Sequence, residues 1–111
     1  MQGVARRNLS GVHHFTRKVD QWIVIGREIA VGPTDIDDAG VRLVANGRVM
    51  GGPNDGEPFK SVHDVQPGQS FNVSPMVAVT VIARRGDEVD LGVLAPPNVE
   101  VERREVIDGR P

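Results

Sequence analysis

The side chains best suited to chemistry in this 111-residue chain are arginines and lysines at two distant places. Residues 1–18 carry a local charge of +4, although the whole chain carries −2. Two arginine pairs come late in the chain, at 84–85 and 103–104. Guanidinium groups bind phosphates and base edges and stack on exposed bases, so a basic patch built from the N-terminal end and a late strand would suit RNA. Charge counting alone leaves open a solvated surface of mixed charge.

Other chemistry finds little support in the sequence. The chain has no cysteine, which excludes disulfides and thiolate metal sites. Its three histidines, His13, His14 and His63, lie in two separate places, so we expect neither a metal site nor another cofactor. Three aspartates at 35–38 are spaced a little like a calcium loop but lack its glycine and closing glutamate, which favours a solvated turn. No catalytic triad or phosphate loop appears, so we expect no enzyme.

The elements that must position these side chains are short strands. Valine and isoleucine are abundant, and 13 glycines and eight prolines supply frequent breaks, which predicts an all-β fold with little or no helix. The expected strands are 12–18, 22–25, 28–32, 41–45, 59–65, 69–73, 76–83, 88–94 and 98–106. A polar turn is expected at 33–40, a hairpin turn at Asn46-Gly47, and further turns at 67–68 and around Gly86. Residues 101–108 fit a helix and a strand equally well.

Neither a membrane span nor a leader is expected. No apolar run approaches the roughly 20 residues that a membrane helix needs. The N-terminal sequence has no long apolar stretch after its arginines, so it does not look like a secretory signal. We therefore expect a cytoplasmic protein.

The chain matches itself when it is shifted by 48 positions. Five identities fall between residues 20 and 43 without a gap: Gln21 with Gln69, Ala30 with Ala78, Val31 with Val79, Val41 with Val89, and Leu43 with Leu91. This predicts two repeats, at 12–50 and 59–106, joined by a Gly/Pro-rich linker at 51–58. A flexible arm at 1–11 and a tail at 107–111 complete the division. Valine-rich strands also match one another by chance, which is the alternative.

Residues 68–106 resemble most of a CsrA/RsmA carbon storage regulator. The resemblance is carried by V-x-L-G-V-x-A-P at 89–96 and by V-x-V-x-R-x-E-V at 99–106. The first half resembles the family's opening in FTRKVDQWIVIGREIAV, at 15–31, and its fourth strand at 40–49. The second half lacks the opening motif and the first half lacks the closing motif.

The resemblance implies a fold and a function. Family members are interwoven homodimers in which each RNA site combines the first strand of one subunit with the fifth strand of the other, and they hold GGA-type loops of messenger RNA and repress translation. Two tandem copies would form an interwoven β-sandwich or barrel as a pseudo-dimer with one working RNA site. The RNA-binding residues that the resemblance implies are Phe15, Thr16, Arg17, Lys18, Ala95, Pro96, Val101, Glu102, Arg103, Arg104 and Glu105.

The expected partner is a single-stranded or hairpin-loop RNA, either a messenger leader or a small regulatory RNA, with no membrane or metal. The chain would be a monomeric pseudo-dimer or a strand-exchanged homodimer. Two departures from the family are expected: eleven residues precede the first strand, and the C-terminal helix is missing. The alternative function is a CsrA-like protein-interaction or decoy module that has lost RNA binding.

Overall fold

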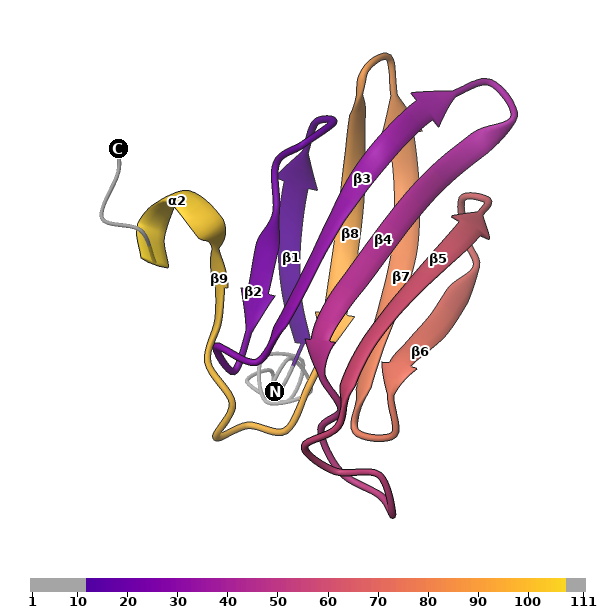
Figure 1. Cartoon of the computed structure of the whole chain (residues 1–111). Helices are drawn as coiled ribbons and strands as arrows, with labels where there is room; N and C mark the ends of the chain where they lie inside the picture. The colour runs from indigo at the N-terminus through magenta and orange to yellow at the C-terminus, as the bar shows by residue number, and fades with distance from the viewer. Residues whose placement is uncertain (1–11, 108–111) are drawn as a thin grey trace, which may run out of the picture.

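Nine strands and one helical turn form the fold of residues 12–107, the part of the chain that the computed structural model describes (Figure 1). The strands are β1 (Val12–Arg17), β2 (Ile23–Ile25), β3 (Ile29–Asp37), β4 (Gly40–Arg48), β5 (Pro58–Val65), β6 (Ser70–Ser74), β7 (Val77–Arg85), β8 (Glu88–Leu94) and β9 (Val101–Arg103). The helical turn is α2 (Arg104–Ile107). The predicted all-β class is confirmed.

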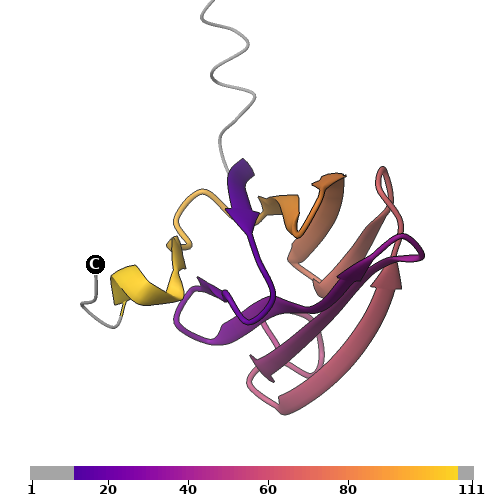
Figure 2. The same cartoon turned by 90° about the horizontal axis from the view of Figure 1, so that it is seen from above.

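The strands build two antiparallel sheets that exchange elements between the two halves of the chain. One sheet has the order β1-β8-β7-β6 and the other the order β5-β4-β3-β2-β9. Each sheet therefore takes its central strands from one half and at least one edge strand from the other. The inner faces enclose a single hydrophobic core, in which Ile23 and Val31 of one sheet and Val79 and Leu91 of the other are fully buried (Figure 2).

The two sheets are paired in the same register at an offset of 48 residues. Ala30 lies opposite Asn46 in β3–β4, and Ala78 lies opposite Leu94 in β7–β8. The register shift also recurs, between residues 33 and 35 of β3 and between residues 81 and 83 of β7. The relation extends to the exchanged strands, since β1 pairs with β8 in the register in which β5 pairs with β4. The two sheets are thus related by a pseudo-twofold arrangement of strands.

The turns before β2 and β6 are closed by the same side chain at this offset. The Gln21 amide oxygen accepts a hydrogen bond from the Lys18 backbone N–H at 2.9 Å, and Gln69 accepts one from Gln66 at 2.9 Å. Position 20 has a φ of 69° and its counterpart Gly68 a φ of 92°, a left-handed conformation that aspartate tolerates and glycine favours. The recurrence of glutamine at 21 and 69 therefore has a local structural cause.

Two expected turns differ from the structure. Strand β3 continues through Pro33 to Asp37 instead of ending at 32, so the polar turn narrows to residues 38–39. The turn at Asn46-Gly47 is wrong, because both residues lie in β4 and pair with β5. Gly47 has a φ of 139°, and a Cβ there would lie 1.9 Å from the Glu28 carbonyl oxygen. Glycine here permits close approach of β3 and β4 and marks no turn.

The end of the described chain also corrects the sequence analysis. The strand expected at 98–106 is only three residues long, because β2 offers just Ile23–Ile25 as partners. The chain then enters α2, so the expectation that a C-terminal helix is missing is wrong. The arm at 1–11 and residues 108–111 of the tail lie outside the described residues. Between residues 12 and 107, no helix is long and apolar enough to cross a membrane.

Candidate nucleic-acid interface

Two sheet edges meet at one corner of the molecule, and we call this the β1–β9 corner: β1, residues 18–22, the crossover at 95–100, β9 and α2. Strand β1 is the edge of one sheet and β9 the edge of the other, so each has a side that no strand of residues 12–107 pairs (Figure 1). Ala95 and Pro96 begin the crossover that carries the chain from β8 in the first sheet to β9 in the second. Unpaired backbone N–H and C=O groups at such edges can bond to base edges.

Arg17, at the end of β1, ties this corner together. Its Nη1 and Nη2 atoms donate to the two carboxylate oxygens of Glu105, each at 3.0 Å. Its Nε donates to the Thr16 carbonyl at 2.9 Å, and Nη1 lies 3.4 Å from the carbonyl oxygen of Trp22. The Arg17 side chain is only 6% exposed. A guanidinium so enclosed positions β1 against α2 and is not presented to solvent.

Glu105 stays charged over a wide pH range because of this contact. The hydrogen bonds from Arg17 lower the pKa of the Glu105 carboxyl from 4.5 to about 2, helped by its own backbone N–H and by the charges of Arg17 and Arg103. Partial burial opposes the shift. Because both oxygens are held by one planar fork, the pair is of the strong, charge-assisted kind.

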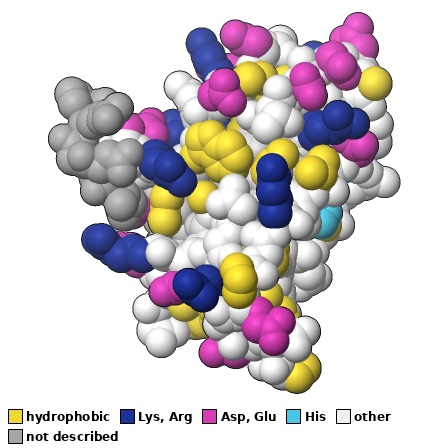
Figure 3. Space-filling view, in the orientation of Figure 1, with side chains coloured by type: hydrophobic (Ala, Val, Ile, Leu, Met, Phe, Trp, Pro, Cys, Tyr) yellow, Lys and Arg dark blue, Asp and Glu magenta, His cyan; other side chains and the backbone are white. Residues whose placement is uncertain are grey.

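Three other cations of the corner remain available to a ligand. The side chains of Arg103 and Arg104 are exposed, and neither has an ion-pair partner within residues 12–107. The Lys18 ammonium lies 3.9 Å from Asp87, with both groups largely in solvent, so that contact holds it weakly. On the face seen in Figure 3, basic side chains alternate with acidic and apolar ones, so the positive charge is local.

The other predicted site residues help to shape the corner. Val101 and Ala95 are buried in the core, and Phe15 packs against the core while half-buried. Thr16 donates a hydrogen bond of 2.8 Å to Asp90 of β8. Glu102 and Pro96 are half-buried. Backbone groups and exposed arginines are therefore the main means by which this corner could bind RNA.

Trp22 is central to the corner, although it is not among the predicted site residues. Its carbonyl also accepts the Arg104 backbone N–H at 2.9 Å, and so joins β2 to α2. Its ring lies against Gly32, where a Cβ would approach the ring to 2.6 Å. The only available signal was that the single tryptophan of the chain stands just before an apolar run.

The opposite corner, formed by β5 and β6, has different residues at the equivalent positions. Val65 stands where Arg17 stands, and Ser70 where Trp22 stands. His63 stacks on Phe71 with ring centroids 4.0 Å apart. No strand of the described chain lies on the outer side of β6. This corner therefore has no counterpart of the Arg17–Glu105 ion pair, which we call the arginine clamp.

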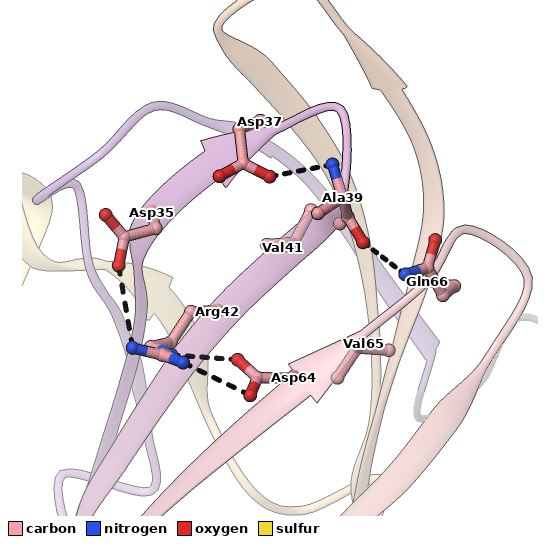
Figure 4. A pocket seen from close by; sticks show the side chains of 9 residues that line it. Asp35, Asp37, Ala39, Val41, Arg42, Asp64, Val65 and Gln66 are labelled. Atoms are coloured by element: carbon pink, nitrogen blue, oxygen red, sulfur yellow. Dashed lines mark hydrogen bonds and ion pairs between the residues drawn. The ribbon is translucent and has the colours of Figure 1, made fainter.

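A polar pocket of about 480 Å³ lies where the β3–β4 hairpin meets the end of β5 (Figure 4). Arg42 donates two hydrogen bonds to Asp64, at 2.8 and 3.3 Å, and lies 4.0 Å from Asp35. The contact raises the pKa of Arg42 and lowers the pKa of Asp64. Gln66 reaches the Ala39 carbonyl. The polar groups of the pocket thus bond to one another, and we interpret them as contacts that hold β4 and β5 together.

The aspartates at 35–38 do not form a metal site. Asp35 and Asp37 lie in β3, and Asp38, in the turn, accepts a hydrogen bond of 3.1 Å from Arg84. Within residues 12–107, no group of three or more His, Asp or Glu side chains is arranged to hold a metal ion.

The comparison with known families concerns the second half of the chain. Residues 65–109 match the model of the CsrA global regulator protein family. The matched segment is less than half of the chain, and the likeness to that family concerns this segment alone. No curated protein and no solved structure matches the chain significantly. The CsrA match includes β9, Arg103, Arg104 and Glu105, whereas β1 lies outside it.

Proposed function

We propose that the chain is a sequence-selective RNA-binding regulator that holds one GGA-type loop at the β1–β9 corner. The observation that carries this proposal is the junction of two strand edges that no strand of residues 12–107 pairs. The Arg17–Glu105 pair closes this junction, and the exposed side chains of Arg103 and Arg104 flank it. A loop with splayed bases suits such a surface, because its base edges are open to backbone and side-chain hydrogen bonds. The arginines would neutralise the phosphates.

Translational repression would follow from competition for the messenger RNA. A loop that includes or flanks a ribosome-binding site cannot pair with the ribosome while it is held at a protein edge. The chain would then act in the cytoplasm without catalysis, and its partner would be a messenger leader or a small regulatory RNA. The activity depends on one local site, which agrees with a net charge of −2 on the whole chain.

We further propose that the chain is a tandem duplication with one working site. The shared register at an offset of 48 residues supports the duplication. Among the residues that the structure describes, β9 has no counterpart beside β6, and Val65 replaces Arg17, so the β5–β6 corner would not bind RNA. The linker at 51–58 would then join two repeats that fold as one unit.

A binding assay tests the function directly. Fluorescence anisotropy with a labelled GGA-loop hairpin and a scrambled-loop control should show clear preference for the GGA loop. Both should be measured at several salt concentrations, because phosphate contacts weaken as salt rises. Equal binding of the two hairpins would contradict sequence selectivity.

A protein-interaction or decoy module is the second candidate. It is favoured by one observation: Arg17, which the resemblance places in the RNA site, is already bound to Glu105 and enclosed. Absence of binding to either hairpin would favour this candidate over RNA regulation.

A further inference from the structure

We propose that the outer edge of β6 receives an extended segment of a partner protein as an added antiparallel strand. Among residues 12–107, β6 is the last strand of its sheet and pairs only with β7. Its equivalent at the offset of 48, β2, is paired on both sides, with β3 and with β9. Strand β9, which pairs with β2 in the five-stranded sheet, is therefore a template for a strand that could be added beside β6 in the four-stranded sheet.

The hydrogen bonds between β2 and β9 identify the free groups on β6. Gly26 donates to the Glu100 carbonyl at 2.6 Å, and Arg104 donates to the Trp22 carbonyl at 2.9 Å. Antiparallel bonds alternate along a strand, so the backbone of Val24, midway between, also points toward β9. Asn72 holds the position of Val24 in β6 and is exposed. Its backbone N–H and C=O are therefore directed to solvent.

A cavity of about 530 Å³ adjoins this edge. It is lined by Val62, His63, Asp64, Val65, Gln69, Ser70 and Phe71. In the β1–β9 corner, the Trp22 ring packs on Gly32 at the equivalent place. Here Ser70 bonds Thr80 at 2.6 Å instead, and no large ring fills the space. The stacked His63–Phe71 pair forms an apolar and aromatic surface on which an incoming side chain can pack.

Val65, which stands where Arg17 stands in the other corner, favours a peptide with an apolar side chain at the place of Glu105. No lysine or arginine lines the cavity, which disfavours RNA, and its one carboxylate, Asp64, is already paired with Arg42. If the added strand carried a glutamate at the position of Glu105, its carboxylate would lie beside Val65 and would have no arginine to pair with. The fitting ligand is an extended segment resembling β9, with an apolar residue in place of that glutamate.

The chain's own described segments are already engaged. Strand β9 is paired with β2, so a second copy could offer it only by giving up that pairing. The segment after β4 folds back through hydrogen bonds from Val49 to Glu57 and from Gly56 to Val49, both at 2.8 Å, and continues into β5. We therefore assign the edge to another protein.

Two peptides test the assignment on the intact protein. One has the sequence of residues 98–107, and the other is the same peptide with Glu105→Val. The valine peptide should bind about tenfold more tightly, as expected when an unpaired carboxylate is removed from an apolar contact. In a titration followed by amide NMR, its binding should shift the signals of 71–73 and leave those of 23–25 unchanged. Shifts confined to 23–25, or none at millimolar peptide, would overturn the proposal.

Two variants and a control locate the contact. Asn72→Pro removes the outward N–H at an edge position where proline is tolerated, and it should weaken binding at least about tenfold. Val62→Asp places a charge at the cavity wall and should also weaken binding. Because Val62 is 56% exposed, this variant should fold and can replace the proline variant if that one does not. Ile82→Asp, at an exposed isoleucine of β7 outside both corners, should leave binding unchanged.

Two results would refute the partner strand. The first is that Val62→Asp and folded Asn72→Pro both bind the valine peptide with wild-type affinity. Self-association of the wild-type protein that Asn72→Pro abolishes would do so as well, because the edge would then join two copies. Neither result depends on RNA binding, which uses the other corner.

Discussion

Arg17 and Glu105, which are 88 positions apart in the chain, form a two-pronged ion pair with both N–O distances at 3.0 Å. One partner ends the first strand and the other lies in the last described turn. The pair therefore closes the fold at the corner where the two sheets meet, and it links the stability of the fold to the geometry of the proposed RNA site.

The pH dependence of this pair can be measured. The folded pKa of Glu105 lies below its usual 4.5, at about 2, so its stabilising contribution is complete above pH 4.5 and is lost as the pH falls toward 2. Glu105→Gln should lower the free energy of unfolding at pH 7 by about 2 kcal/mol. Urea unfolding should show a much smaller difference between variant and wild type near pH 2. A difference that stays constant with pH would contradict the assignment.

Arg103→Ala should weaken RNA binding without destabilising the fold. The side chain is exposed and unpaired within the described chain, and a charge-assisted contact is worth about 1.5–3 kcal/mol, which corresponds to roughly tenfold to a hundredfold in affinity. Anisotropy with the GGA-loop hairpin measures this, and thermal unfolding checks the fold. Arg84→Ala is the control, because Arg84 lies at the far hairpin and bonds Asp38. An Arg103→Ala protein with wild-type affinity would remove the main support for the RNA site.

Arg17→Ala should act differently from Arg103→Ala. Its loss leaves Glu105 without its partner and opens the contact between β1 and α2, so both stability and RNA affinity should fall. Removing one member of a buried pair typically costs about 3–5 kcal/mol, and the partial exposure of Glu105 reduces this. The double variant with Arg103→Ala should lose less affinity than the sum of the two, since losing Arg17 disturbs the same corner from which Arg103 would contact the loop. Unchanged unfolding of Arg17→Ala would show that the clamp is not structural.

One RNA should bind per chain. The β5–β6 corner has Val65 in place of Arg17, and no strand of the described part of the chain is equivalent to β9 there. Titration calorimetry with the GGA-loop hairpin should give a stoichiometry of one, and two equivalent sites would contradict the argument from the missing residues.

The protein should be a monomer of 12.0 kDa in dilute solution. Strands β1 and β9 both come from this chain, so no partner chain is needed to supply them. Static light scattering measures the mass. A dimer would indicate that tandem chains exchange strands, which is a low-cost route to association.

Local patterns predicted the second half of the fold well. The alternation at 59–65, the apolar run at 76–83 and the segment at 88–94 all became strands close to their expected bounds. Pro33 and Gly47 misled the prediction in the first half. Proline lacks an N–H but is accommodated beside the register shift of β3, and the glycine serves close approach of strands. The conformations of Pro33 and Gly47 thus depend on the strands beside them, which the local sequence does not reveal.

The candidate site was less accessible to sequence reasoning. Arginine at position 17 looks like a surface residue, and its burial depends on a carboxylate 88 residues away. Likewise, nothing in the local sequence indicates that β2 is too short to keep 98–106 in one strand. The family resemblance pointed to these residues as a group, but their individual roles follow from three-dimensional contacts.

Encoding both corners in one polypeptide has a consequence for variation. In an assembly of identical subunits, a change at one codon alters every symmetry-related site at once. Here residues 17 and 65 occupy equivalent places yet belong to different codons, so each corner can change its chemistry while the other is kept. The Arg17–Glu105 ion pair in one corner and the cavity beside Val65 in the other show how far two equivalent places can differ around one hydrophobic core.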